Sequence, residues 1–247
     1  MLSPIEQSIK RKIEAVGTPL KDWDINIYRG VLTGCNEAFI ISTAKRNEIL
    51  DNCQTEDERK RTAELIRPIL RGRDIKRYEY VDNGLYLINT HNGIKGKFPR
   101  IDINDYPAVK AHLDQYWDKI SARADKGDTP YNLRNCAYLE DFSKPKIIYP
   151  DICTFLSFEL DTSCFYLSNT AYFLITEKEE YLKYFLRVLN SSVMDWYYRT
   201  LSVQLGEKAV RMFSIYVLNI PIPPISDEPI EEILKLSKEE KLFISGS

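Results

Sequence analysis

The residues best suited to chemistry in this sequence are cations, and most of them gather in one region. Its eight basic residues are Arg59, Lys60, Arg61, Arg67, Arg71, Arg73, Lys76 and Arg77. Glu64 and Asp74 oppose them, so residues 59–77 carry a formal charge of +6 in a chain whose total is −2. Guanidinium groups held on a turn can bind phosphate or the edge of a guanine. A solvated loop that binds nothing fits the charge equally well.

The second half of this region, residues 65–78, is predicted to be a tethered turn, which we call the basic turn. Its Arg67-Pro68 step cannot lie inside a regular helix, because proline lacks the N–H group and restricts the residue before it. Gly72 is expected to let the backbone turn between Arg71 and Arg73. Apolar anchors stand on both sides of that glycine: Ile69, Leu70 and Ile75.

Three further polar loops could join the basic turn in binding a polyanion. They are Thr33-Gly34-Cys35-Asn36, Tyr131-Asn132-Leu133-Arg134-Asn135 and Gln204-Leu205-Gly206-Glu207-Lys208. Amide side chains can pair with adenine, arginine with guanine, and lysine with phosphate. Each loop alone is typical of plain turns, but several on one scaffold favour a polyanion-binding surface.

The sequence lacks the residue patterns that most catalytic mechanisms require. There is no glycine-rich phosphate loop, no G-x-G-x-x-G, and no Asn-Pro-Pro-aromatic motif of amino methyltransferases. Pro150-Asp151 resembles half of a metal-nuclease motif, but Glu159-Leu160-Asp161 follows without the lysine, so we interpret Asp151 as a turn residue. Five cysteines without a C-x-x-C pair and only two histidines argue against zinc and against nucleophilic catalysis.

Composition predicts a globular protein of the cytoplasm. The 247 residues, 44% of them hydrophobic, can form one large domain or two small ones. No apolar run reaches membrane-spanning length, and the start of the sequence lacks the pattern of a signal peptide.

The pattern of elements predicts an α+β fold with largely antiparallel sheets and flanking helices. Ser3-Pro4 is expected to begin a helix that Gly17 ends, and Thr43 and Thr55 are expected to begin two short ones. We expect longer helices at 106–124, 179–189, 191–201 and 229–243, the last acidic and amphipathic. Hairpins are predicted at 23–42 and, around Asn83-Gly84, at 78–90. Further strands are expected at 146–149, 154–160, 164–167 and 170–176. No regular β-α-β alternation links these elements.

Five segments in this order resemble one protein family. They are residues 30–39, 66–78, 132–136 with 144–149, 189–192 and the Pro221-Ile222-Pro223-Pro224 run. Together they are similar to the TaqI-like C-terminal specificity domain, the target recognition domain of type IIG restriction-modification enzymes and related adenine methyltransferases. The resemblance covers roughly residues 23–224, and none of its motifs is catalytic.

The resemblance implies a module that reads duplex DNA within a longer polypeptide. An upstream methyltransferase domain would flip and methylate an adenine with S-adenosylmethionine, and a nuclease domain, where present, would use Mg²⁺. The module itself would need no cofactor. It would be non-catalytic and would occupy residues 21–225, between a connector helix (1–20) and a C-terminal acidic helix (226–247).

The resemblance also implies which residues face DNA. They are Thr33, Asn36, Arg71, Arg73, Lys76, Arg77, Asn132, Arg134 and Lys208. Arg71, Arg73, Lys76, Arg77 and Lys208 are expected to meet phosphate, and Asn36, Asn132 and Arg134 to meet base edges. Asp74 is expected to orient Arg71 or Arg73.

Two other functions remain open from sequence. One is a domain that docks onto a partner subunit through aromatic residues of the late helices: Tyr181, Tyr184, Trp196, Tyr197 and Tyr198. Residues at that spacing are more often core. A more distant alternative is an independent nuclease.

Overall fold

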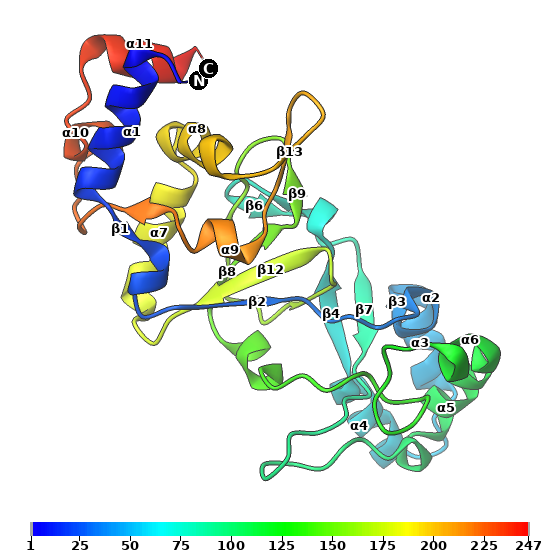
Figure 1. The fold of residues 1–247 in the computed structure, drawn as a ribbon. Helices are drawn as coiled ribbons and strands as arrows, with labels where there is room; N and C mark the ends of the chain where they lie inside the picture. Colours follow the sequence, from blue (N-terminus) through cyan, green and yellow to red (C-terminus); the bar gives the residue numbers. More distant parts are fainter. Residues whose placement is uncertain (1, 247) are drawn as a thin grey trace.

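A four-stranded antiparallel sheet lies at the centre of the chain. The computed structural model describes residues 2–246, and Figure 1 shows an elongated molecule with helices at both ends. The central sheet has the order β10 (Glu159–Asp161), β8 (Lys146–Pro150), β12 (Ala171–Ile175) and β2 (Asn26–Arg29). Every neighbouring pair is antiparallel. This confirms the predicted fold class.

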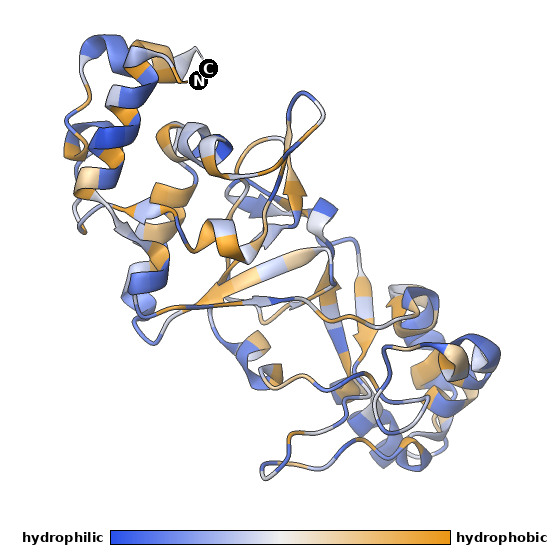
Figure 2. Ribbon diagram, in the orientation of Figure 1, coloured by the Kyte–Doolittle hydropathy of each residue, from blue (hydrophilic) through white to orange (hydrophobic). Residues whose placement is uncertain are grey.

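The two faces of the central sheet belong to two separate hydrophobic cores. Ile147 and Tyr149 face the first core, whereas Ile148, between them, faces the second. On β12, Phe173 joins the second core with its neighbours two residues away. Strand side chains alternate between faces, so a strand that is apolar throughout must be covered on both sides. Figure 2 accordingly shows the ribbon of β12 as largely hydrophobic.

Helices complete the first core. They are α1 (Pro4–Val16), α7 (Leu182–Leu189), α8 (Ser192–Leu201), α9 (Ser214–Val217), α10 (Ile230–Ile233) and α11 (Lys238–Ser245). Of these, α7 lies on the sheet, and α1, α10 and α11 lie farther from it (Figure 1). The expected caps are present, because the side chains of Ser3 and Ser191 accept hydrogen bonds from the first turns of α1 and α8. A short pair, β1 (Thr18–Pro19) with β15 (Pro221–Ile222), joins the two terminal segments.

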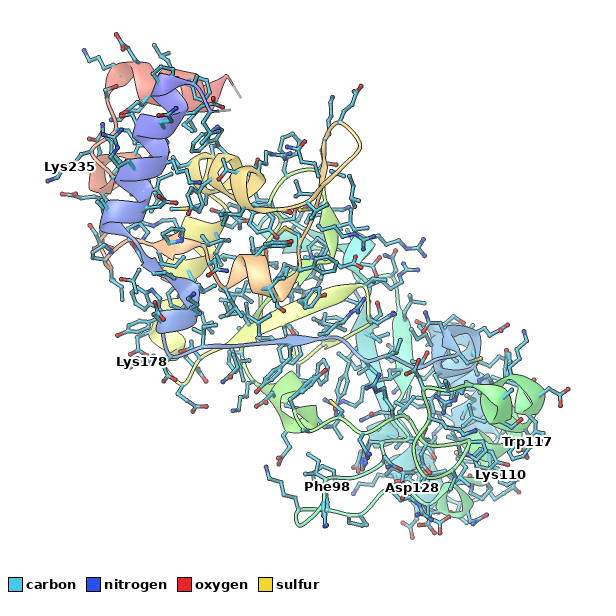
Figure 3. The ribbon with its side chains drawn as sticks, viewed as in Figure 1. Phe98, Lys110, Trp117, Asp128, Lys178 and Lys235 are labelled. Atoms are coloured by element: carbon cyan, nitrogen blue, oxygen red, sulfur yellow. The ribbon has the colours of Figure 1, made fainter. Side chains whose placement is uncertain are left out.

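The second core packs against a second four-stranded sheet, which contains both parallel and antiparallel pairs. Its order is β11 (Tyr166–Leu167), β4 (Ile66–Leu70), β7 (Leu85–Ile88) and β3 (Ile40–Ser42), with β11 and β4 parallel. The helices of this half are α2 (Asn36–Phe39), α3 (Thr43–Asp51), α4 (Glu56–Leu65), α5 (Pro107–Asp114) and α6 (Trp117–Ala122). Figure 3 labels Lys110 and Trp117 at this end of the molecule and Lys235 at the opposite end.

Two small sheets complete the fold. One contains β13 (Gln204–Leu205), β14 (Ala209–Arg211) and β9 (Ile152–Cys153), and the other pairs β5 (Ile75–Lys76) with β6 (Glu79–Tyr80). Five 3-10 turns stand between the larger elements, at Leu20–Asp22, Gly72–Asp74, Ile103–Asp105, Leu139–Ser143 and Glu179–Tyr181.

Both predicted hairpins are wrong. The strand that ends at Arg29 pairs with β12, and β3 pairs with β7 in the other sheet. The run Ala38-Phe39 is fully buried on the short helix α2 instead of lying in a strand. Likewise β6 pairs with β5, while β7 lies between β3 and β4. Turn residues showed where the chain reverses, but tertiary pairing decided the partners.

Three predicted elements are shorter than expected. The helix expected at 106–124 breaks at Tyr116, whose backbone leaves the helical region, and Trp117 is consequently 44% exposed instead of joining the apolar face. The C-terminal helix is split into α10 and α11 by Lys235, which has a φ of 54°. The strand expected at 154–160 is replaced by β9 and β10, with a loop between them.

The aromatic residues proposed as a partner-docking face lie in the first core. Tyr184, Trp196, Tyr197 and Tyr198 are at most 8% exposed, and Tyr181 is half-buried against the same core. The terminal segments join this core too, because Ile9 and Ile13 of α1 are fully buried in it with Ile244 of α11. No described helix is long and apolar enough to cross a membrane.

Candidate nucleic-acid interface

Asp74 organises the basic turn. It ends the 3-10 turn η2 (Gly72–Asp74) that follows β4, and it is only 3% exposed. Its carboxylate accepts hydrogen bonds from the backbone N, Nε and Nη2 of Arg71 at 2.8, 2.9 and 2.9 Å and from Nδ2 of Asn83 at 2.9 Å. Burial opposes ionisation of Asp74, but these donors outweigh it and hold its pKa below the ordinary value. The predicted pairing of Asp74 with Arg71 is therefore confirmed.

Gly72 is required for close packing and not for its turning freedom. Its φ is not positive, so the backbone here does not need the conformational freedom of glycine, and that part of the expectation is wrong. A Cβ atom at this position would lie 2.2 Å from the carbonyl oxygen of Thr170. The Gly72 N–H donates to Oγ1 of Thr170 at 2.8 Å. This contact fixes the basic turn against the end of the central sheet.

The eight cations of residues 59–77 do not form one surface. Arg59, Lys60 and Arg61 lie on α4, and the five-residue strand β4, about 16 Å long, separates them from Arg71. Arg59 pairs with Asp51 at 3.0 Å. Arg73 and Lys76 are exposed, and no ion pair or hydrogen bond of their side chains occurs among residues 2–246. The free positive charge of the basic turn thus reduces to these two residues.

A groove of about 660 Å³ brings three of the predicted residues together. Arg71 and Arg73 line one side of it, and Asn36 of α2 lines another. Asn36 is exposed, and its Oδ1 accepts a hydrogen bond from Oγ1 of Thr33 at 2.6 Å. Its Nδ2 has no partner in the described part of the chain, so it remains free to donate. Ile152 of β9 contributes an apolar wall.

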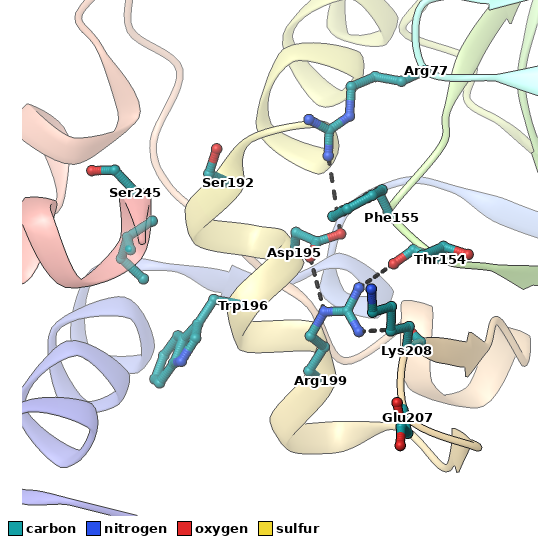
Figure 4. A pocket seen from close by; sticks show the side chains of 11 residues that line it. Arg77, Thr154, Phe155, Ser192, Asp195, Trp196, Arg199, Glu207, Lys208 and Ser245 are labelled. Carbon is teal, nitrogen blue, oxygen red and sulfur yellow. Dashed lines mark hydrogen bonds and ion pairs between the residues drawn. The ribbon is translucent and has the colours of Figure 1, made fainter. Parts of the chain in front are cut away.

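A second concavity of about 470 Å³ lies on the other side of β9. Arg77 and Lys208 line it together with Phe155, Asp195 and Arg199 (Figure 4). The remaining lining residues are Thr154, Ser192, Trp196, Glu207, Ile244 and Ser245. Lys208 lies in the hairpin of β13 and β14, which projects from the body in Figure 1.

The groove and the second concavity share no lining residue, but the same two segments of the chain contribute to both. Residues 71–73 line the groove, and Arg77 lines the second concavity. Asp151 and Ile152 belong to the groove, and Thr154 and Phe155 to its neighbour. We call the groove and the second concavity together the recognition face. Five predicted residues contribute to it: Asn36, Arg71, Arg73, Arg77 and Lys208.

Asn132, Thr33 and Arg134 lie elsewhere. Asn132 is 1% exposed, donates from Nδ2 to the carbonyl of Ile101 at 2.9 Å and accepts from Oγ1 of Thr129 at 2.6 Å. Thr33 is likewise 1% exposed. Neither side chain has surface to offer a base edge in this structure. Arg134 is exposed and paired with Asp125 at 3.2 Å, outside the recognition face.

Sequence reasoning did not single out Arg123. Its guanidinium is buried and donates to the carbonyls of Thr33, Asp125, Pro130 and Asn132, the last three at 2.6, 3.0 and 2.7 Å. Burial lowers the pKa of Arg123. The side chain joins two polar loops that lie about ninety residues apart in sequence. Its position three residues after the buried Ile120 was the available signal, because i and i+3 share a helix face.

No group of three or more metal-ligating side chains occurs among residues 2–246. Burial raises the pKa of Asp151, the half-motif of a metal nuclease. Its backbone N–H donates to the carbonyl of Thr170, and its carbonyl accepts from the N–H of Met212. These contacts place Asp151 where β8 ends and β9 begins.

Comparison with known proteins gives one family. The family model described as the TaqI-like C-terminal specificity domain matches residues 67–222. The fold is similar to that of the type IIG restriction endonuclease BpuSI, with a TM-score of 0.57 and 15% identity over 96% of this chain and 27% of that one. It is also similar to the type IIL restriction-modification enzyme MmeI, solved in complex with DNA, with a TM-score of 0.58 and 14% identity over 82% and 25%. The chain therefore spans about a quarter of the length of each.

Proposed function

The chain belongs to the TaqI-like C-terminal specificity domain family, and from this premise we propose that it reads a specific sequence in double-stranded DNA and is non-catalytic by itself. The observation that carries the proposal is the recognition face. It combines free cations, a free amide and apolar side chains on segments fixed by buried hydrogen bonds. Phosphate contacts position such a module, and polar groups held in a groove read base edges.

We assign phosphate contacts to Arg73, Lys76 and Lys208. Each is exposed and has no ion pair of its own among the described residues. Asn36 and Arg71 are the candidates for base edges. Arg71 is held in a fixed orientation by Asp74, and Asn36 keeps a free donor in the same groove. Arg77 donates to the carbonyl of Leu156 at 3.1 Å and keeps part of its guanidinium at the surface.

The near-neutral charge of the chain is compatible with this proposal. Electrostatic attraction depends on where charge lies, and several cations outside the recognition face are paired with carboxylates, such as Lys119 with Glu37 and Arg100 with Asp128. A module joined to a second DNA-binding domain would also share the work of holding phosphate.

The parent enzyme is part of the proposal. We infer a longer cytoplasmic polypeptide in which a methyltransferase domain supplies S-adenosylmethionine-dependent adenine methylation. A nuclease domain, where present, would supply Mg²⁺-dependent cleavage. This chain would contribute the choice of target. BpuSI and MmeI, about four times as long, are a restriction endonuclease and a restriction-modification enzyme of similar fold over the matched part.

The test is binding of the chain to a randomised duplex pool, measured by fluorescence anisotropy across a salt series. We expect affinity to fall steeply with salt, because each neutralised phosphate adds roughly 0.9 to the slope of log K against log salt. Replacing Arg73 and Lys76 with alanine together should lower that slope by about 2. Sequencing the retained duplexes would give the target.

Lys178→Ala is the matched control. Lys178 is exposed, and Figure 3 shows it on a different part of the surface, near the end of β12. Its removal should leave the salt slope unchanged. Equal slopes for the Arg73 and Lys76 double variant and the wild type would contradict the assignment of these cations. Retained duplexes without any shared sequence would contradict specific recognition.

A further inference from the structure

Phe155 is a large apolar side chain held out in solvent within the recognition face. It lies in the loop between β9 and β10 and is 61% exposed, while Leu156 and Phe158 beside it are buried. Burying such a ring normally stabilises a fold. This aromatic side chain instead remains at the surface, beside Arg77 and Asp195 (Figure 4).

The loop that presents Phe155 is fixed on both sides by charged side chains. Arg199 donates to the carbonyl of Thr154, and Asp195 accepts from the N–H of Leu156 at 2.6 Å. Arg77 donates from Nε to the carbonyl of Leu156 at 3.1 Å. The exposed ring therefore does not follow from a loosely held loop. It stands on backbone that is anchored immediately before and immediately after it.

The surroundings of the ring favour a nucleic-acid base over an apolar protein surface. Three cations, Arg77, Arg199 and Lys208, line the same concavity against two carboxylates. Asp195 is already occupied by Arg199 at 3.0 Å and by the Leu156 N–H. Lys208 has no partner for its ammonium group among residues 2–246. An aromatic ring with a free ammonium group and two further cations at its margin matches a base and its flanking phosphates.

We propose that Phe155 enters the duplex and stacks on a base at the edge of the sequence that the recognition face reads. This inference rests on the proposed function, since it needs DNA on that face. Apolar wedges of this kind partly unstack a base step. The ring contributes affinity by stacking, independently of salt, while Lys208 and Arg73 contribute the salt-dependent part.

The test compares Phe155→Ala with Phe155→Trp and with Ile215→Ala. Ile215 is a matched control because it is also 61% exposed and lines neither concavity of the recognition face. We expect Phe155→Ala to lower affinity for the selected duplex on the order of ten-fold with an unchanged salt slope. Phe155→Trp should retain affinity, and Ile215→Ala should bind like the wild type.

A second readout follows base stacking directly. 2-Aminopurine placed at successive positions of the selected duplex should brighten at one step with the wild type and not with Phe155→Ala. Equal affinity of Phe155→Ala and wild type, or a lowered salt slope in Phe155→Ala, would overturn the stacking role and leave the proposed function standing. Absence of DNA binding by the wild-type chain would overturn both.

Discussion

Two loop regions of this molecule are built around a buried charged side chain, with opposite results at the surface. In the basic turn, Asp74 is buried and binds Arg71 and Asn83, and Arg73 and Lys76 stay free. In the other region, Arg123 is buried and binds carbonyl groups. The polar side chains there, Thr33 and Asn132, are buried with it.

The difference lies in what the buried charge binds. A carboxylate takes N–H groups from its own turn and leaves neighbouring cations outside. A guanidinium has five donors, so it gathers carbonyl groups from several segments and draws those segments together. Arg123 therefore holds buried loops together, whereas Asp74 fixes a turn that leaves its neighbouring cations exposed to solvent. Polar residue types in a loop do not by themselves distinguish these outcomes.

Among the variants that test this comparison, Arg123→Met should have the largest effect on the free energy of unfolding. It removes a donor from four carbonyl groups, of which that of Asn132 keeps the Gly127 N–H, and we expect the free energy of unfolding to fall by roughly 3–5 kcal/mol. Urea denaturation would measure it. Arg134→Met, which removes an exposed ion pair with Asp125, should cost less than about 1 kcal/mol. Similar losses in the two variants would contradict the scaffold role of Arg123.

Within the two loop regions, Asp74→Asn should come next. The amide cannot accept the paired hydrogen bonds from Arg71 as a carboxylate does, and we expect a loss of about 2 kcal/mol by urea denaturation. DNA affinity should fall as well, because Arg71 loses its orientation. Asp82→Asn is the control, because this exposed carboxylate accepts only the Gly84 N–H within residues 2–246. A stable Asp74→Asn with unchanged binding would show that the turn does not depend on this carboxylate.

Glu240 is a third buried charged residue, far from both loops, and its contribution to stability should depend on pH. Burial opposes its ionisation, but Lys12, Ser8 and the Ser237 N–H outweigh burial and lower its pKa to about 2. The folded-state pKa is depressed, so the stabilisation is present above about pH 4.5 and is lost as pH falls toward 2. Wild type should exceed Glu240→Gln in free energy of unfolding by about 3 kcal/mol at pH 6, the equivalent of that drop in pKa. The gap should close near pH 2, and a constant gap across pH would refute this linkage.

Arg73→Ala should have the smallest effect on stability. The side chain is exposed without a partner, so we expect a change within about 0.5 kcal/mol in thermal unfolding. Its DNA affinity should nevertheless fall. A clear loss of stability would mean that Arg73 belongs to the scaffold, as Arg123 does, and would remove the contrast between the two regions.

The sequence predicted the fold class, the capped helices and the basic turn, because these depend on local signals such as Ser3-Pro4 and the Arg67-Pro68 step. It did not predict that β2 and β3 belong to different sheets, since pairing partners are set by burial across the whole chain. Asn36, Arg71 and Arg73 line the groove, and Arg77 and Lys208 line the second concavity. Asn132 lines neither, because its amide matches the loop backbone around Ile101 and Thr129.

The central sheet has a consequence for engineering new target sequences. Strands β8 and β12 contribute to both cores through adjacent residues, so neither half of the chain can fold or be exchanged without the other. Amide hydrogens of these strands should be the last to exchange with solvent. Two segments of the recognition face meet at one end of this shared sheet, where both Gly72 and Asp151 donate backbone hydrogen bonds to Thr170. A transplant of specificity must therefore carry short loops into an intact scaffold, and grafting half a domain would separate the two walls of the groove.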